Sequence, residues 1–392
     1  MLASAELPHD FIQYWAVGRL LWTGENPYDA ALQLREQRHA YPQRDIALMM
    51  WNPPPALALY APWGLLPPWT AAVLWNGLQL VAVVAAAFLL VQVYAPSATV
   101  WWFLPLTLGF VGTWWLLFYG QNTGWILLGL AGFVWGQHRQ RPLLAGCCGA
   151  LTILKPHLLL AFGLLWLTDL AYKGRPRMTV LAGLGLVAAT TGLALGRDPA
   201  ILTHFIQALQ TPSPYAIPLA SWMLPTASYW LRIWLVPDSF LFQFVPAVIT
   251  SVVLLVWKLK QGSGWSWPET LPLVVAVSVL TTGYGGWIFD LPVLLVPVIA
   301  IAARLLRWGY GTAFFLVTIW QLSVTLTSLY FSATLHGFWW VAPAVLGPAV
   351  LLPFLGLQAG SSSPPGSTNA CPVAHPETVH SVEWSKSSLG PR

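Results

Sequence analysis

Residues 69–94 read WTAAVLWNGLQLVAVVAAAFLLVQVY, and this stretch contains no charged side chain. A helix needs about 20 predominantly apolar residues to cross a hydrocarbon core of ~30 Å. Residues 69–94 are therefore long enough and apolar enough to span a bilayer, and they predict an integral membrane protein.

The composition of the 392-residue chain extends this prediction to most of its length. Hydrophobic residues make up 57% and charged residues only 8% of the chain, whereas about 25% of the residues of a soluble domain are charged. So few charges cannot solvate the surface of a protein of this size, and most of that surface must face lipid. The net charge of +5 does not indicate a nucleic-acid partner, because the basic residues fall in short clusters between apolar runs.

Further apolar runs follow, so we expect an all-α, polytopic transmembrane protein with about 11 spans. The predicted spans lie near residues 69–94, 98–118, 122–136, 142–154, 157–170, 177–195, 239–258, 268–282, 288–304, 310–331 and 337–356. Several are short, and a helix of about 13 residues reaches only ~20 Å. Short helices are tolerated where their ends line a wet cavity enclosed by protein, and we expect such a cavity on the outer face.

The chain divides by composition into an N-terminal segment at 1–55, a transmembrane helical domain at 56–356 and a tail at 357–392. Residues 10–55 of the N-terminal segment hold five of the 13 acidic residues and no run long enough to span a bilayer. Its pattern predicts an amphipathic helix over 10–22 and a second helix capped by Asp29, both at the outer membrane surface. The tail is rich in Ser, Pro and Gly, so we expect it to be disordered and cytoplasmic.

Four basic clusters between the apolar runs predict the orientation of the chain. They are His138-Arg139-Gln140-Arg141, Lys173-Gly174-Arg175-Pro176-Arg177, Lys258-Leu259-Lys260 and Arg304-Leu305-Leu306-Arg307. The positive-inside rule places all four on the cytoplasmic side, and the predicted spans then alternate without conflict. The polar and Gly/Pro-rich segments gather on the opposite, outer face: residues 1–68, 120–122, 155–157, 196–238, 283–290 and 332–336.

Two carboxylates on that face stand beside aromatic residues. The stretch HDFIQYW at residues 9–15 contains Asp10, and the apolar body that follows holds few acids. Asp10 is therefore the candidate for proton transfer, although Asp10-x-x-Gln13 also fits a capping box, and the two roles can coexist. Asp290 is the second candidate, and it could equally cap a helix that begins at residue 291.

Lys155 needs an explanation, because it interrupts the apolar run 142–170. An ionisable residue at membrane depth indicates a functional site, and the alternative is a lysine whose ammonium reaches the outer interface. In the functional interpretation, Lys155 binds an anionic group and His157 is a second donor. Gln121 and Asn122 could add neutral hydrogen bonds, although their stretch is also typical of a turn.

Six short motifs, in this order, resemble glycosyltransferase family 87 over roughly residues 10–305. They are Asp10-Phe11-x-x-Tyr14, Gly24-x-Asn26-Pro27-Tyr28, Asn52-Pro53-Pro54, Ala61-Pro62-x-x-Leu65-Leu66-Pro67, Gly120-Gln121-Asn122, and Ala145-Gly146 followed by Leu154-Lys155-Pro156. The resemblance implies a GT-C fold in the cell membrane, a polyprenyl-phosphate sugar as donor, and a lipid or glycan acceptor on the non-cytoplasmic face. Mannose is the best-known sugar of the family.

The resemblance also implies that an aspartate in the first outer loop is the catalytic base, and here that position is Asp10. Tyr14 belongs to the same motif and is included in the substrate site. Family members usually carry a helix before this aspartate, so either a short uncharged tail crosses unaided or the true chain begins upstream. Gly285-Gly286 stands where a Ser-Pro type of sequence is expected, and the substrate choice is therefore left open.

The chemistry that the family performs agrees with these residues. A phosphate leaves without a general acid, so the transfer needs one base and positive charge on the phosphate, whereas glycoside hydrolysis needs two opposed carboxylates. We therefore expect an inverting displacement in which Asp10 takes the proton, and Lys155 with His157 holds the phosphate. Gln121, Asn122, Tyr14 and Asp290 complete the predicted substrate site.

Two further expectations follow from the residue inventory. The histidines are scattered without metal-ligand spacing, so we expect no metal and no cofactor besides the lipid-linked donor. The alternative function is a lipid or solute transporter or flippase, which would usually show internal repeats, and the chain has no convincing repeat. Asp10 and Lys155 should open onto one cavity in an enzyme, and need not do so in a transporter.

Overall fold

The computed structural model describes residues 10–210, 224, 226–330 and 340–354, and every regular element in this part of the chain is a helix. The chain divides into two units, residues 1–350 and 351–392, and only the end of the last helix is described in the second. The predicted outer segment 332–336 and the predicted disordered tail at 357–392 lie outside the described residues.

The α-helices alternate with short 3-10 helices along the chain. The α-helices are α1 (Phe11–Thr23), α2 (Ala30–Gln37), α3 (Leu57–Tyr60), α4 (Pro68–Tyr94), α5 (Leu104–Leu108), α6 (Val111–Tyr119), α7 (Thr123–His138), α8 (Pro142–Ala150), α9 (Leu160–Leu167), α10 (Arg175–Leu195), α11 (Ile201–Gln210), α12 (Ala227–Leu235), α13 (Val245–Gln261), α14 (Trp267–Thr281), α15 (Leu295–Arg307), α16 (Gly311–Tyr330) and α17 (Val341–Phe354). The 3-10 helices are η1 (Pro54–Ala56), η2 (Ala61–Leu65), η3 (Val100–Phe103), η4 (Leu151–Leu154), η5 (Pro156–Leu159), η6 (Thr168–Ala171), η8 (Phe240–Phe244), η9 (Gly262–Gly264) and η10 (Ile288–Leu294).

Five helical stretches are long and apolar enough to cross a membrane. They are Pro68–Tyr94, Arg175–Leu195, Phe240–Gly264, Ile288–Arg307 and Gly311–Tyr330. Two bent helix pairs raise the count to seven if each pair is one span: Val100–Leu108 with Val111–Tyr119, and Pro142–Leu154 with Pro156–Ala171. A multi-pass, all-helical membrane protein is therefore confirmed, but a count of 11 spans is not.

The count differs for two physical reasons. The predicted spans at 122–136, 268–282 and 337–356 fold as α7, α14 and α17, which have 16, 15 and 14 residues and fall short of the ~20 residues that a span needs. The predicted spans at 142–154 and 157–170 are instead two arms of one pair, bent by 119° at Lys155.

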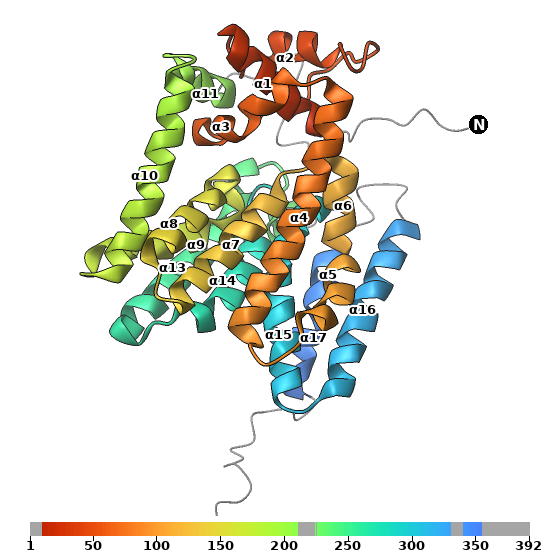
Figure 1. Cartoon of the computed structure of the whole chain (residues 1–392), viewed down its shortest axis with the longest axis vertical. Helices are drawn as coiled ribbons and strands as arrows, with labels where there is room; N and C mark the ends of the chain where they lie inside the picture. Colours follow the sequence, from red (N-terminus) through yellow and green to blue (C-terminus); the bar gives the residue numbers. More distant parts are fainter. Residues whose placement is uncertain (1–9, 211–223, 225, 331–339, 355–392) are drawn as a thin grey trace, which may run out of the picture. The chain divides into compact units, whose positions relative to one another are not determined.

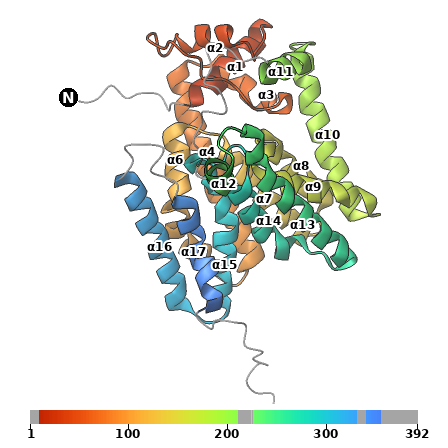
Figure 2. The same ribbon diagram turned by 180° about the vertical axis from the view of Figure 1, so that it is seen from behind.

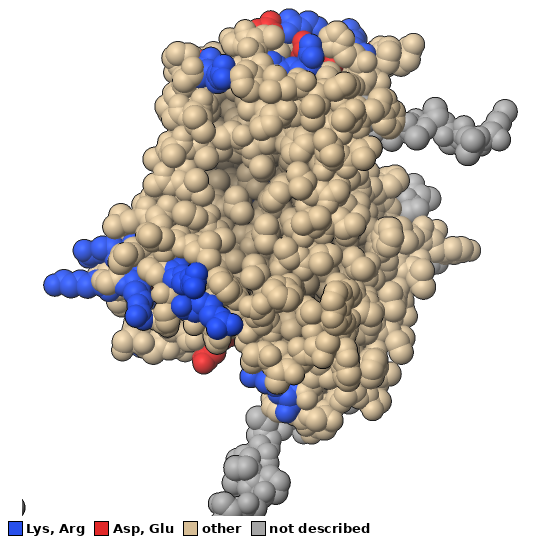
Figure 3. Space-filling model, viewed as in Figure 1, with Lys and Arg blue, Asp and Glu red and all other residues tan. Residues whose placement is uncertain are grey.

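Helices α1, α2, α3 and α11 lie together at one end of the first unit (Figure 1). Helices α4 and α10 run from there toward the opposite end, and α15, α16 and α17 lie side by side when the unit is viewed from behind (Figure 2). Charged side chains gather near both ends, whereas the face between them is uncharged in this view (Figure 3). This distribution agrees with a membrane-embedded middle and two polar interfaces.

Helix α1 differs from the amphipathic surface helix that its pattern predicts, because ten of its 13 residues are buried. It packs so closely on α3 and η2 that a Cβ on Gly18 would lie 2.5 Å from the carbonyl oxygen of Tyr60 and 2.7 Å from the backbone nitrogen of Gly64, so only glycine fits there. The ring of Tyr14 stacks on Tyr60 at 4.6 Å, and the indole of Trp75 in α4 lies 5.4 Å from Tyr14. These rings bury α1 between η2 and α4, and thereby fix Asp10 at its start.

Candidate active site

Asp10 begins α1 but does not cap it, because its side chain makes no capping hydrogen bond. Its backbone N–H donates to the carbonyl oxygen of Tyr119 at 2.9 Å, which ties the start of α1 to the end of α6. Its Oδ2 accepts a hydrogen bond from Nε2 of Gln121 at 2.7 Å, and the residue is only 8% exposed. Of the two roles that the sequence left open for Asp10, the structure shows a tertiary contact and no cap.

Gln121 is the residue that joins the candidate side chains. It follows Gly120, whose φ of 68° ends α6 in the left-handed conformation and turns the chain. The side-chain oxygen of Gln121 accepts from the hydroxyl of Tyr14 at 2.7 Å and from Nζ of Lys155 at 2.8 Å. Burial raises the pKa of Tyr14 well above its ordinary value, so the phenol remains a donor. Gln121 therefore connects Asp10, Tyr14 and Lys155 through one amide.

Lys155 lies at the break between η4 and η5 and is buried, with 7% of its surface exposed. The alternative of an ammonium that reaches the interface is therefore wrong. Its Nζ donates to Oδ1 of Asp290 at 2.6 Å, and it lies 5.2 Å from the ring centre of Phe289. Asn52 binds the chain just before this break, because its side-chain amide donates to the carbonyl oxygen of Leu154.

Asp290 is 1% exposed and receives four hydrogen bonds. Oδ1 accepts from Nζ of Lys155 at 2.6 Å and from the hydroxyl of Thr123 at 2.9 Å. Oδ2 accepts from the backbone N–H of Gly286 at 3.1 Å and from that of Trp287 at 3.3 Å. The predicted capping role is thus present, but it serves η10, which begins at Ile288 and not at residue 291. A carboxylate has about four lone-pair directions, so four donors leave Asp290 poorly suited to accept a further proton.

His157 lies beside this network and does not contact Lys155 through its ring. Its imidazole packs edge-on against Tyr284 at 4.9 Å, and a Cβ on Gly285 would lie 2.9 Å from that imidazole and 3.6 Å from Oδ2 of Asp290. Gly285 also has a φ of 77°, so a side chain there would be both crowded and strained. In the described part of the chain, no hydrogen bond to the His157 ring is found.

Asn122 is fully buried next to Gln121 and is only partly satisfied. Its Nδ2 donates to the hydroxyl of Tyr60 at 2.6 Å. Its Oδ1 has no hydrogen-bond partner within the described residues. A buried acceptor without a donor costs free energy unless a ligand or water supplies one, so Asn122 is consistent with a polar substrate group.

Arg44 was not singled out from the sequence, because nothing in its neighbourhood distinguishes it from the other arginines of 1–55. The side chains of Arg19, Arg35 and Arg38 pair with glutamates or with Asp45. Arg44 has no such ion pair in the part of the chain described, and its guanidinium lies 5.1 Å from the ring centre of Tyr41. Partial burial lowers the pKa of Arg44, while the charges of Tyr41 and Asp10 oppose that shift. Arg44 is thus a half-buried cation of the N-terminal segment.

The structure therefore brings together six of the seven predicted site residues in hydrogen-bonded or adjacent positions, and places His157 beside them. The cavity expected around them is not confirmed. A pocket of about 500 Å³ lies on α2, another of about 370 Å³ lies among the basic clusters, and no predicted site residue lines either one. Asp10 and Lys155 do share one network, through Gln121.

The sequence profile of glycosyltransferase family 87 matches residues 51–332, which is well over half of the chain. The chain belongs to glycosyltransferase family 87. As a member of this family it is a membrane glycosyltransferase, and the resemblance inferred from the short motifs is confirmed. No curated protein and no solved structure matches it. Of the candidate residues, Gln121, Asn122, Lys155, His157 and Asp290 lie within the family match, whereas Asp10 and Tyr14 precede it.

Proposed function

We propose that this family 87 glycosyltransferase moves a hexose, with mannose as the first candidate, from a polyprenyl-phosphate sugar to a lipid or glycan acceptor. The reaction proceeds with inversion on the non-cytoplasmic face of the cell membrane, in a GT-C fold. One observation carries the proposal: Gln121 links Asp10, the candidate base, to Lys155, the candidate cation. Paired buried charges also occur in transporters, so the family match is what favours an enzyme over a transporter.

Asp10 acts as the base in this proposal. The acceptor hydroxyl gives its proton to the carboxylate of Asp10 while its oxygen forms a bond to C1 of the sugar. The bond from C1 to the phosphate oxygen breaks on the opposite face, and its electron pair leaves with the polyprenyl phosphate. Asp290 is the weaker candidate for this role, because four donors already occupy its oxygens.

Lys155 binds the departing phosphate. An ammonium has three protons, and Lys155 gives two of them to Gln121 and Asp290, so one remains for a ligand. Because Asp290 neutralises much of the charge of Lys155, a phosphate needs further donors. In this proposal His157, which lies beside Asp290, supplies one further donor and Arg44 is the candidate for another, while Asn122 offers an acceptor to a sugar hydroxyl. The proposed reaction uses the lipid-linked donor and no metal.

The decisive experiment measures the transfer of radiolabelled sugar from a synthetic polyprenyl-phosphate-mannose in membranes that contain the wild type or Asp10→Asn. We expect Asp10→Asn to reduce transfer by about 10²- to 10⁴-fold, the usual contribution of a general base, without loss of folded protein. Asp45→Asn is the matched control, since its carboxylate is 93% exposed and belongs to the same segment.

Each outcome of this experiment has a distinct meaning. Equal transfer by wild type and Asp10→Asn would remove Asp10 from the mechanism and direct attention to Asp290. A wild type that transfers glucose but not mannose from the same carrier would correct the sugar and keep the donor class. No transfer of any hexose from a polyprenyl phosphate would overturn the donor class.

A further inference from the structure

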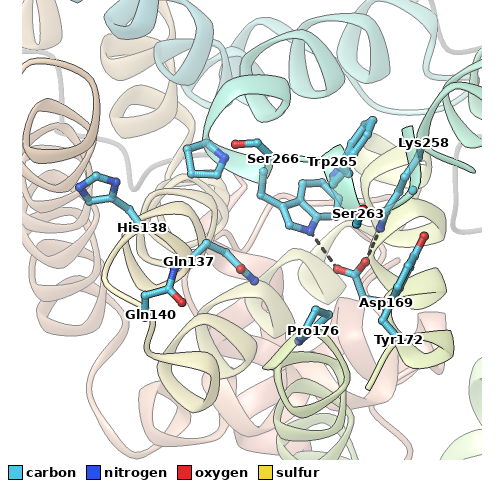
Figure 4. A pocket seen from close by; sticks show the side chains of 13 residues that line it. Gln137, His138, Gln140, Asp169, Tyr172, Pro176, Lys258, Ser263, Trp265 and Ser266 are labelled. Atoms are coloured by element: carbon cyan, nitrogen blue, oxygen red, sulfur yellow. Dashed lines mark hydrogen bonds and ion pairs between the residues drawn. The ribbon is translucent and has the colours of Figure 1, made fainter. Parts of the chain in front are cut away.

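A pocket of about 370 Å³ lies at the end of the unit where the basic clusters gather, away from the candidate active site. Helix ends form its wall: the end of α7, the segment between η6 and α10, the end of α13 with η9, and the start of α14. Figure 4 shows its polar side chains, among them Gln137, Gln140, Ser263 and Ser266, around Asp169 and Lys258. No part of the proposed transferase mechanism uses this pocket.

The inner wall of the pocket is a buried ion pair. Nζ of Lys258 donates to Oδ1 of Asp169 at 2.5 Å and to the carbonyl oxygen of Leu165 at 2.6 Å. Nε1 of Trp267 donates to Oδ2 of Asp169 at 2.9 Å (Figure 4). Nζ of Lys258 also lies 4.8 Å from the ring centre of Trp267 and 5.6 Å from that of Trp265, so indole faces cover the ammonium as well. Nε1 of Trp265, another lining residue, is buried and lacks a hydrogen-bond partner among the residues described. One neutral donor at the pocket is thus left without an acceptor there.

Basic residues flank the lining residues of the pocket in the sequence, and we call these flanking segments its rim. Residues 137–141, 169–177 and 258–269 contain seven Lys and Arg residues but only two carboxylates, those of Asp169 and Glu269. Lys258 alone among these seven lines the pocket, and Asp169 neutralises it, so the surplus charge belongs to the flanking residues, of which Arg175 donates to the side chain of Gln140. Orientation signals explain basic residues at a membrane surface, but they do not require a pocket with neutral donors between them.

Exposed apolar side chains lie on α10 and α13, close in the sequence to residues that line the pocket. Met178 and Leu181 on α10 are exposed, and so are Val256 and Leu259 on α13. These four residues follow directly from the segments that line the pocket, so acyl chains could lie against them while a headgroup occupies the polar space. A water-soluble anion would gain nothing from these surfaces.

We propose that this pocket binds the phosphate headgroup of an anionic phospholipid from the surrounding membrane. The rim arginines and lysines attract the negative charge, the amides and hydroxyls of Gln137, Gln140, Ser263 and Ser266 bond the phosphate and glycerol oxygens, and the indoles lie at interface depth. The inference does not depend on the sugar, the donor or the base of the proposed reaction.

Native mass spectrometry of the full chain in detergent tests this site, with phosphatidylglycerol and phosphatidylcholine as probes. We expect the wild type to retain phosphatidylglycerol in preference to phosphatidylcholine. Ser263→Trp fills the pocket from an exposed position and should abolish the preference. Arg175→Gln should weaken phosphatidylglycerol binding by roughly fivefold, the usual effect of one basic side chain near an anionic headgroup. Arg307→Gln, at the end of α15 and outside the pocket, is the matched control and should change nothing.

Four results would overturn the proposal. Equal retention of both lipids would remove the headgroup selectivity. A loss in Arg307→Gln equal to that in Arg175→Gln, or full binding by Ser263→Trp, would mean diffuse charge and not a site. Displacement of the lipid by millimolar glycerol 3-phosphate would assign the pocket to a soluble phosphate compound. All of these readouts are independent of sugar transfer, so failure here leaves the proposed function untouched.

Discussion

Two buried lysine–aspartate pairs in the described part of the chain have nearly the same geometry and different surroundings. Lys155 and Asp290 are joined at 2.6 Å, and Lys258 and Asp169 at 2.5 Å. The first pair continues through Gln121 to Tyr14 and to a second carboxylate, that of Asp10. The second pair ends at a backbone carbonyl and at an indole N–H. A buried ion pair alone therefore does not mark a catalytic site, and the connection to a second acid is what distinguishes the candidate active site from the other pair.

Mutation of either pair should lower the free energy of unfolding by a similar amount, but only mutation of the pair at Lys155 should also reduce sugar transfer. Removal of one partner from a buried pair leaves an uncompensated charge and costs about 3–5 kcal/mol, wherever the pair lies. Only the pair at Lys155 is close to the residues proposed to handle the proton and the phosphate. Mutations that break each pair in turn separate these two effects.

Lys155→Met is expected to have the largest effect, after Asp10→Asn. It removes the proposed phosphate donor and leaves Asp290 unpaired, so transfer per folded molecule should fall by about 10²- to 10³-fold and stability by about 3–5 kcal/mol. Adding Asp290→Leu should restore most of the stability and none of the transfer. Recovery of transfer in the double variant would show that Lys155 serves only to neutralise Asp290.

Lys258→Met tests the second pair in the same way. The loss of stability should be similar, about 3–5 kcal/mol, because Asp169 is left buried and unpaired. Transfer per folded molecule should stay close to that of the wild type, and Asp169→Leu in the same chain should restore thermal stability. A selective loss of transfer in well-folded Lys258→Met would contradict the division between the two pairs.

Gln121→Ala removes the amide that connects Asp10 to Lys155 and leaves the charges of Lys155 and Asp290 in place. It therefore tests the connection separately from the ion pair. It removes hydrogen bonds to Asp10, Tyr14 and Lys155, two of them to charged groups at ~1.5–3 kcal/mol each. We expect transfer to fall by roughly ten- to a hundredfold. Gln92→Ala is the control, since Gln92 accepts one hydrogen bond from Trp135 outside the network. If Gln121→Ala and Gln92→Ala reduced transfer equally, the connection through Gln121 would not matter for the reaction.

Glu25→Gln breaks an ion pair at the surface, for comparison with the two buried pairs, and should have the smallest effect on stability. Glu25 pairs with Arg35 at 2.5 Å on the surface of the N-terminal segment, where solvent screening limits such a pair to about 1 kcal/mol or less. Hydrogen bonds from Arg35 and Thr23 lower the pKa of Glu25. Its contribution is therefore present above the unfolded-state pKa and is lost as the pH falls through the lower, folded-state pKa. The difference in thermal unfolding between wild type and Glu25→Gln should shrink on acidification, and a growing difference would contradict this sign.

Several features were predictable because they depend on local sequence. Apolar runs located the helices, and the cap at Asp29 is present, with the backbone N–H of Leu32 donating to its carboxylate at 2.8 Å. Short motifs were enough to identify the family. The interruption of an apolar run was enough to select Lys155. Hydrophobic content and helix breaks depend on residues that are neighbours in the sequence, so they can be predicted without knowledge of the tertiary structure.

Other features depend on contacts between distant segments, and there the sequence was insufficient or misleading. The pattern of α1 indicated a surface helix, but η2 and α4 bury it on nearly all sides. Asp10 matched a capping box, but its carboxylate is directed to Gln121, 111 residues away. Asp290 looked like a possible base, yet four donors from separate segments surround it.

The sequence by itself determined that this chain is a helical membrane protein of family 87 and that Asp10 and Lys155 deserve attention, because hydropathy and motifs are local. Only the tertiary structure decided that one glutamine joins these two residues, that Asp290 is saturated, and that a second buried pair lies at a pocket among the basic clusters. Hydrogen bonds form between whichever groups packing brings within about 3 Å, and that proximity is a property of the whole fold.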